Sequence, residues 1–122
     1  MTFEEYQKKA LSTVLSTGDE FKDLLHWVLG ITGEAGEVAE KVKKIIRDKN
    51  SVVTEDDKKE LAKELGDVLW YIAVFANDLG VSMDEIAQTN LDKLASRKER
   101  GVLGGSGDNR QLVGKFFAKP VV

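Results

Sequence analysis

The sequence predicts an all-α domain in which four main helices form a bundle-like arrangement. Two observations lead to this class. Apolar residues recur every three or four positions in four separate segments, and the starts of three of these segments carry the spacing of a helix capping box. A chain of 122 residues, 42% hydrophobic and 32% charged, has the size and composition of one helical domain. We expect this domain to span residues 1–110, followed by a flexible tail over 111–122.

The first helix is predicted to begin at Thr2, because Glu5 stands three residues later and can complete a capping box. The run Thr17-Gly18-Asp19 interrupts the helical pattern after it. The apolar stripe of this segment comprises Phe3, Tyr6, Ala10 and Val14.

The second helix is predicted from near Asp19 to about Asp48. Three glycines interrupt its interior, and each costs about 1 kcal/mol relative to alanine. Two explanations stay open. Either the glycines allow another group to approach the backbone or the helix to kink, or they only allow tight packing against a neighbouring helix. The glycines are Gly30, Gly33 and Gly36, and the apolar stripe is Phe21, Leu24, Val28, Ile31, Ala35, Val38, Val42, Ile45 and Ile46.

The third helix is predicted from Thr54, with Asp57 at the capping-box position, to Leu79, where Gly80 stops it. From Val68 to Ala76 this helix is apolar on all sides, which a small domain rarely covers alone. We therefore expect a homo-oligomer that buries this segment between subunits. The predicted core stripe is Leu61, Leu65, Val68, Ile72, Ala76 and Leu79.

The fourth helix is predicted to begin at the Ser82 and Glu85 capping box and to end near Arg100-Gly101. One face is expected to point to the core and another to carry polar groups. The glycine-rich segment 104–110 could close over bound phosphates, or it could be a frayed terminus. The core face is Met83, Ile86, Ala87, Leu91 and Leu94, and the polar face is Asn90, Lys93 and Arg97.

Two carboxylate pairs at helical spacing are the main chemical feature: Glu34 with Glu37, and Glu64 with Asp67. Residues three apart lie on one face of a helix, so facing helices would gather four like charges. A hard divalent cation with oxygen ligands, such as Mg²⁺, removes that repulsion. The alternative is a solvated acidic face, but the second pair continues into Tyr71, which favours a covered cleft.

These pairs resemble the E-x-x-E…E-x-x-D signature of the MazG-like all-α nucleoside triphosphate pyrophosphohydrolases. The flanks Gly33–Val38 and Glu64–Leu69 match it, as does the later Asn90-x-x-Lys93-x-x-x-Arg97, and the similarity covers roughly residues 20–110. The resemblance implies Mg²⁺-dependent hydrolysis of nucleoside triphosphates to the monophosphate and pyrophosphate, in nucleotide-pool house-cleaning. Mn²⁺ is an alternative ion, and a tetramer is favoured over a dimer.

The resemblance also implies roles for individual residues. Glu34, Glu37, Glu64 and Asp67 would hold the metal, and one of them, for which Glu37 is a candidate, would accept the proton of the attacking water. Lys93 and Arg97, with Asn90 on the same face, would contact phosphate. Tyr71 would contact the sugar or base, and Trp27 could stack on the base.

Several other classes are excluded or kept as alternatives. A net charge of −3 without a basic cluster argues against nucleic acid, and the longest apolar run is too short for a bilayer. The acidic N-terminus does not resemble a signal peptide, so we expect a cytoplasmic protein. The single histidine, His26, leaves a di-iron bundle without half its ligands. The alternatives are a phosphoribosyl-ATP pyrophosphohydrolase and a non-catalytic helical oligomerisation module.

Overall fold

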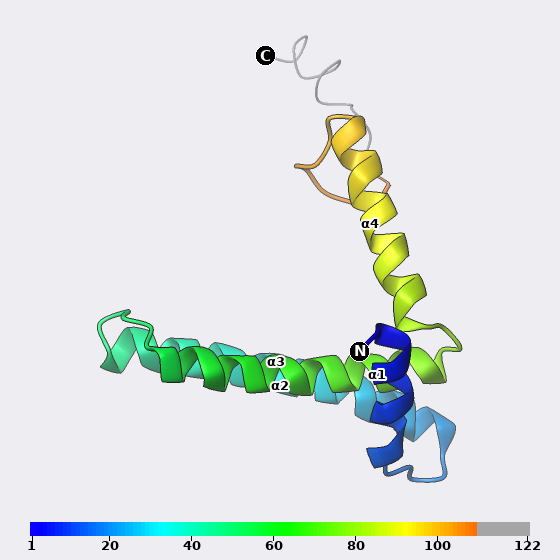
Figure 1. The fold of residues 1–122 in the computed structure, drawn as a ribbon, viewed down its shortest axis with the longest axis horizontal. Helices are drawn as coiled ribbons and strands as arrows, with labels where there is room; N and C mark the ends of the chain where they lie inside the picture. Colours follow the sequence, from blue (N-terminus) through cyan, green and yellow to red (C-terminus); the bar gives the residue numbers. More distant parts are fainter. Residues whose placement is uncertain (110–122) are drawn as a thin grey trace. The chain divides into compact units, whose positions relative to one another are not determined.

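The computed structural model describes residues 1–109 (Figure 1). The predicted flexible tail over 111–122 lies outside the described residues. Within the described chain every regular element is helical, which confirms the all-α class. The elements are α1 (Phe3–Ala10), a 3₁₀ turn η1 (Leu11–Thr13), α2 (Glu20–Asp48), α3 (Glu55–Asp78) and α4 (Met83–Glu99).

Two helices begin with the capping boxes predicted for them. The Thr2 hydroxyl accepts a hydrogen bond from the Glu5 N–H (3.1 Å), and the Glu5 carboxylate accepts one from the Thr2 N–H (2.8 Å). Thr54 and Asp57 form the same reciprocal pair at the start of α3. Gly80 follows α3 with a φ of +75°, a conformation that favours glycine, so the helix ends where predicted.

The described chain divides into two compact units. The first unit, Met1–Met83, contains α1, α2 and α3, and the second begins at Asp84 and contains most of α4. In the first unit, α2 and α3 run side by side as an antiparallel hairpin, and α1 packs against α3 (Figure 1). The arrangement of all four helices as one bundle stays a prediction, because α4 belongs to the second unit.

Gln7 of α1 fixes the first helix to the end of α3. Its side chain is buried, and its amide Nε2 donates to the carbonyl oxygens of Ala73 and Val81, each at 3.2 Å. Its Oε1 accepts from the Met83 N–H at 3.1 Å. A buried polar group needs such partners, so this position specifies how α1 docks. The apolar cluster around it consists of Ala10, Ala73 and Met83, with Tyr6, Leu69 and Trp70 packed against them.

Trp27 joins α2 to α3 near the open end of the hairpin. Its side chain is 2% exposed, and its Nε1 donates to Asp78 Oδ2 at 2.6 Å. Its ring meets Trp70 edge-on, with centroids 6.0 Å apart and planes at 81°. Such an edge-to-face pair adds to the stabilisation from burial, so these contacts fix the register of the two helices.

The predicted core stripes are only partly buried in this chain. Leu65 and Leu79 are 60% and 55% exposed, and the predicted core face of α4 is exposed at Ile86, Leu91 and Leu94. The prediction was wrong at these positions. In the first unit, α2 and α3 cover only the sides that face each other, and α4 is the one helix that the described part of the second unit contains. Among the described residues, no helix is long and apolar enough to cross a bilayer.

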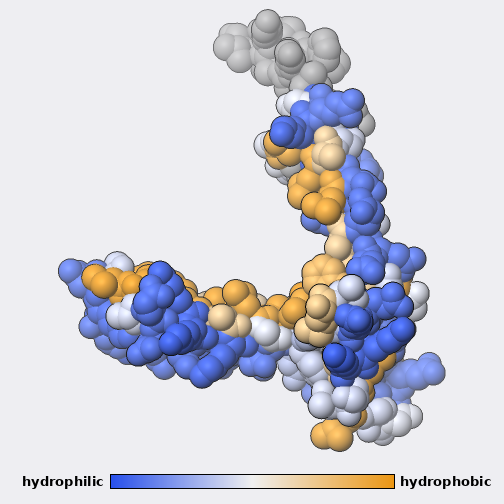
Figure 2. Space-filling model, viewed as in Figure 1, coloured by the Kyte–Doolittle hydropathy of each residue, from blue (hydrophilic) through white to orange (hydrophobic). Residues whose placement is uncertain are grey.

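One side of α2 exposes a continuous row of mostly apolar residues, whereas the apolar segment of α3 is covered within the chain. Every residue from Val68 to Ala76 is buried or half-buried within the chain. One side of α2 instead exposes residues at alternating spacings of four and three, and Figure 2 shows hydrophobic side chains along one edge of the hairpin. We call these residues the α2 stripe: Phe21, Leu25, Val28, Thr32, Ala35, Ala39, Val42 and Ile46.

Gly30 allows a close contact between α2 and α3. A Cβ atom at Gly30 would overlap the ring of Tyr71, whereas one at Gly33 or Gly36 would meet nothing within 4 Å. Of the two explanations for these glycines, tight packing against a neighbouring helix therefore holds for Gly30. The other two face open space in this chain.

We expect Gly30→Ala to be less stable than Gly36→Ala by about 1–3 kcal/mol. Both substitutions gain about 1 kcal/mol from helix propensity, but only the first forces the Tyr71 ring out of a packed position. Urea unfolding followed by circular dichroism measures the difference. Equal stability of the two variants would contradict the contact between Tyr71 and Gly30.

Candidate metal centre

Three carboxylates meet between α2 and α3. Glu34 comes from α2, and Glu64 and Asp67 come from α3, where their spacing of three places them on one face. One oxygen from each lies within 4.8 Å of the others. Glu34 and Glu64 are half-buried and Asp67 is exposed, so the group lies between the helices and opens to solvent at Asp67.

The electrostatics of the group are unfavourable without a cation. Burial raises the pKa of Glu34, and the neighbouring charges of Asp67, Glu64 and Glu37 and a hydrogen bond with Glu64 raise it further. Like charges this close favour a protonated partner. All the atoms available to bind a metal here are carboxylate oxygens, which are ligands that Mg²⁺ and Mn²⁺ prefer in proteins. The residues present therefore fit a hard divalent cation.

Glu37 lies at the edge of this group. It is exposed and is not among the three carboxylates that converge, although it is near enough to raise the pKa of Glu34. The structure thus brings together three of the four predicted ligands and places the fourth beside them.

Two neighbours of the cluster were missed by the sequence analysis. Lys41 of α2 places its Nζ 3.3 Å from Glu64 Oε1. Its position seven residues after Glu34, two turns along the same face, was a signal that could have identified it. The second is Tyr6 of α1, whose pKa is raised by burial and then by the charge of Asp67. The position of Tyr6 depends on how α1 docks, which no local pattern reveals.

The two predicted nucleoside contacts differ in exposure. Tyr71 lies one turn beyond Asp67, is half-buried and meets Trp70 edge-on, with centroids 4.9 Å apart. Trp27 is buried between the helices and stacks on His26, so its ring is covered in this chain.

The predicted phosphate contacts belong to the second unit. Lys93 Nζ lies 3.3 Å from Asp108 Oδ1, and Arg97 Nη2 lies 3.2 Å from the same oxygen. Arg97 is 6% exposed and also donates to the carbonyl oxygens of Gly107 (3.3 Å) and Asp108 (2.8 Å). Lys93, and then Arg97, lower the pKa of the Asp108 carboxyl. Asn90, on the same helix, is exposed.

Comparison with known proteins identifies the region that contains the carboxylates. The sequence model of the MazG nucleotide pyrophosphohydrolase domain matches residues 20–102. The Gene 37 protein of Mycobacterium phage L5 is 48% identical over 114 residues, which cover 90% of this chain and all of that protein. The protein YpjD of Bacillus subtilis strain 168 is 36% identical over 67 residues, covering 55% of this chain and 60% of that protein. No solved structure matches significantly.

We expect Glu34→Gln to raise the melting temperature of the metal-free protein at pH 7. The folded-state pKa of Glu34 lies above its ordinary value of 4.5, so the native protein loses stability as pH rises through that raised pKa. Glutamine removes this loss, and its advantage should shrink as the pH falls below 4.5. Thermal unfolding in EDTA, followed by circular dichroism across this pH range, measures the effect.

Glu40→Gln on the same helix is the matched control. A hydrogen bond with Lys43 is the main cause of the lowered pKa of Glu40, so this variant should not gain stability at pH 7. A lower melting temperature for Glu34→Gln than for the unmodified protein at pH 7 would contradict the repulsion described for the cluster.

Proposed function

Because the chain belongs to the MazG nucleotide pyrophosphohydrolase family, we propose that it hydrolyses nucleoside or deoxynucleoside triphosphates to the monophosphate and pyrophosphate. The observation that carries the proposal is the convergence of Glu34, Glu64 and Asp67 inside the matched region. Mg²⁺ is the proposed ion, with Mn²⁺ as an alternative, and nucleotide-pool house-cleaning in the cytoplasm is the proposed role. The net charge of −3 argues against a nucleic-acid partner.

The three converging carboxylates would hold the cation through their oxygens. When bound, a divalent cation would neutralise phosphate charge and favour ionisation of the attacking water. Glu37 lies beside the cluster and outside it, which suits it to accept the water's proton. Attack at the α-phosphorus forms the new P–O bond, and the bond to the bridging oxygen breaks so that this oxygen leaves with pyrophosphate.

Of the other predicted site residues, some are proposed to contact the substrate and others to hold neighbouring groups in place. Lys93, half-buried, suits a contact with phosphate, and Asn90 lies on the same helix face. Arg97 can bind phosphate only if it exchanges its present partners at Gly107 and Asp108, so it also positions that segment. We assign Tyr71 to the sugar or base and give Trp27 a supporting role beneath it.

A homo-oligomer is the proposed assembly, with a tetramer favoured over a dimer. Its support is the α2 stripe, whose seven-residue repeat is typical of a helix that packs lengthwise against another helix. The small side chains at Thr32, Ala35 and Ala39 would let a second copy approach closely. Two hairpins that met along this stripe would bring four helices together.

We expect hydrolysis to require a divalent ion and both motif acids of α3. Glu64→Gln and Asp67→Asn should each lower kcat/KM by at least about a hundredfold, because several kcal/mol of transition-state stabilisation is lost. Pyrophosphate release across a panel of nucleoside triphosphates and phosphoribosyl-ATP, with Mg²⁺ or EDTA, measures this. Glu55→Gln, in the first turn of the same helix, is the matched control and should retain activity.

The same panel separates the alternatives. Turnover of phosphoribosyl-ATP alone would identify that enzyme class, and no turnover of any substrate would support a non-catalytic assembly module. Near-normal turnover by either α3 variant, with helical circular dichroism intact, would refute the assigned site.

We expect Val42→Glu to shift the protein towards monomer at micromolar concentration. The substitution places a charge in the α2 stripe, where a second copy would bury it without a partner. Light scattering coupled to size exclusion measures the mass. Lys43→Gln, at the next position and outside the stripe, should keep the assembly, and a monomeric unmodified protein would contradict the proposal.

A further inference from the structure

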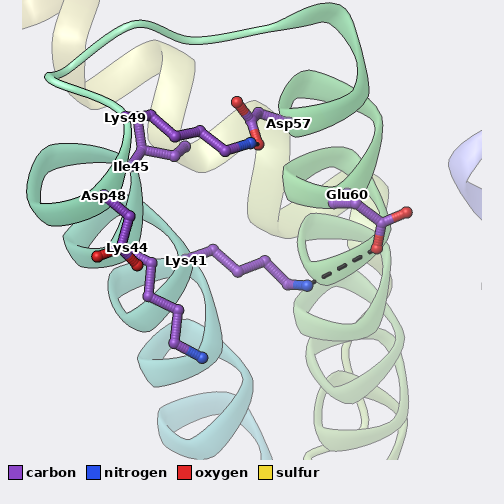
Figure 3. Close-up of a pocket in the computed structure, with 7 residues that line it drawn as sticks. All are labelled: Lys41, Lys44, Ile45, Asp48, Lys49, Asp57 and Glu60. Atoms are coloured by element: carbon purple, nitrogen blue, oxygen red, sulfur yellow. Dashed lines mark hydrogen bonds and ion pairs between the residues drawn. The ribbon is translucent and has the colours of Figure 1, made fainter.

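Lys41 is the cation closest to the carboxylate cluster in the described chain. Its Nζ lies 3.3 Å from Glu64 Oε1 and 3.7 Å from Glu60 Oε2, so it bridges two acids one turn apart on α3. The side chains of Lys41 and Glu64 are 31% and 16% exposed. Figure 3 shows Lys41 reaching from α2 across to Glu60. Partial burial makes this pair stronger than one on the open surface.

The lysines near Lys41 have other partners. Lys41 lines a cavity of about 310 Å³ near the closed end of the hairpin, together with Lys44, Ile45, Asp48, Lys49, Asp57 and Glu60. Lys49 pairs with Asp57 at 2.6 Å, and Lys44 pairs with Glu40 at 3.9 Å. The cavity carries three lysines and three acids, so it has no excess charge to attract an anion. Lys41 differs because one of its partners is a proposed metal ligand.

We propose that Lys41 is the internal counter-ion of the metal-free centre and competes with the divalent cation for Glu64. The inference rests on the proposed metal centre. A carboxylate that binds Mg²⁺ shares its negative charge with the ion, and the ion repels the ammonium group, so Glu64 bound to the ion would attract Lys41 less strongly. Glu60 offers Lys41 a second partner already 3.7 Å away, so Lys41 keeps a carboxylate while Glu64 moves.

This competition has two opposite consequences. In the metal-free protein, Lys41 reduces the repulsion within the cluster and so stabilises the fold. When the ion binds, the same pair opposes it. Loss of the Lys41 charge should therefore lower stability without metal and increase metal affinity, whereas a purely structural residue would lower both.

The test is Mg²⁺ binding and thermal unfolding of the full chain with Lys41→Gln. By isothermal titration calorimetry, we expect the variant to bind Mg²⁺ about three- to tenfold more tightly than the unmodified chain. This is the effect expected from losing a half-buried ion pair, which is stronger than an exposed pair and weaker than a fully buried one. We also expect a lower melting temperature in EDTA and a larger rise on adding Mg²⁺. Lys44→Gln removes the same charge one turn further along α2, and we expect a smaller change in both quantities.

Glu60→Gln tests the mechanism in the opposite direction. It removes the alternative partner of Lys41, so the lysine should stay on Glu64 and Mg²⁺ should bind more weakly. This variant also decides the question if Lys41→Gln does not fold in either buffer.

If Mg²⁺ affinity were unchanged or weaker in Lys41→Gln, or unchanged in Glu60→Gln, the inference about Lys41 would be overturned. The proposed metal centre would still stand. An unmodified chain that binds no Mg²⁺ would refute both the metal centre and this inference. Neither readout requires hydrolysis, so the two failures are distinguishable.

Discussion

Repulsion among Glu34, Glu64 and Asp67 is the force that the packing of the hairpin must overcome. The packing of α2 against α3 places their oxygens within 4.8 Å of one another, where like charges oppose the packing. The helices stay together because other contacts compensate. Trp27 is buried and bonded to Asp78, and the open backbone at Gly30 receives the ring of Tyr71. The apolar contacts at one end of the hairpin therefore hold the acids in an arrangement that charge alone would open.

The two sides of α2 serve different purposes. The side facing α3 is buried or half-buried and includes Trp27, Glu34 and Lys41, so it carries both the packing and the charges of the centre. The α2 stripe lies on the exposed side and contains no charged residue. Because each side repeats every seven residues, one helix can serve α3 and a second copy at once. In the proposed oligomer, the burial of the stripe would add stability that offsets the cost of gathering the acids.

The sequence predicted the features that depend on local rules. Capping at Thr2 and Thr54 and the spacing of Glu64 and Asp67 need only the geometry of one helix. It could not predict the exposure of Leu65, because burial depends on how many neighbours surround a helix. The Lys41 pair with Glu64 depends on the register between two helices, which Trp27 and Gly30 set through tertiary contacts. The limit of the prediction has a physical reason. Periodicity determines which residues share a helix face, whereas tertiary packing determines what that face contacts.

In each unit, some residues of the proposed site form ion pairs within their own chain. Lys41 pairs with Glu64 in the first unit, and Asp108 pairs with Lys93 and Arg97 in the second. In the proposed reaction, the cation would take over the partner of Lys41 and the phosphates would take over the partners of Asp108. Breaking an ion pair costs free energy, so each exchange lowers the affinity of its ligand and favours a ligand that replaces the lost contact. This is a physical basis for specificity through differences in binding free energy.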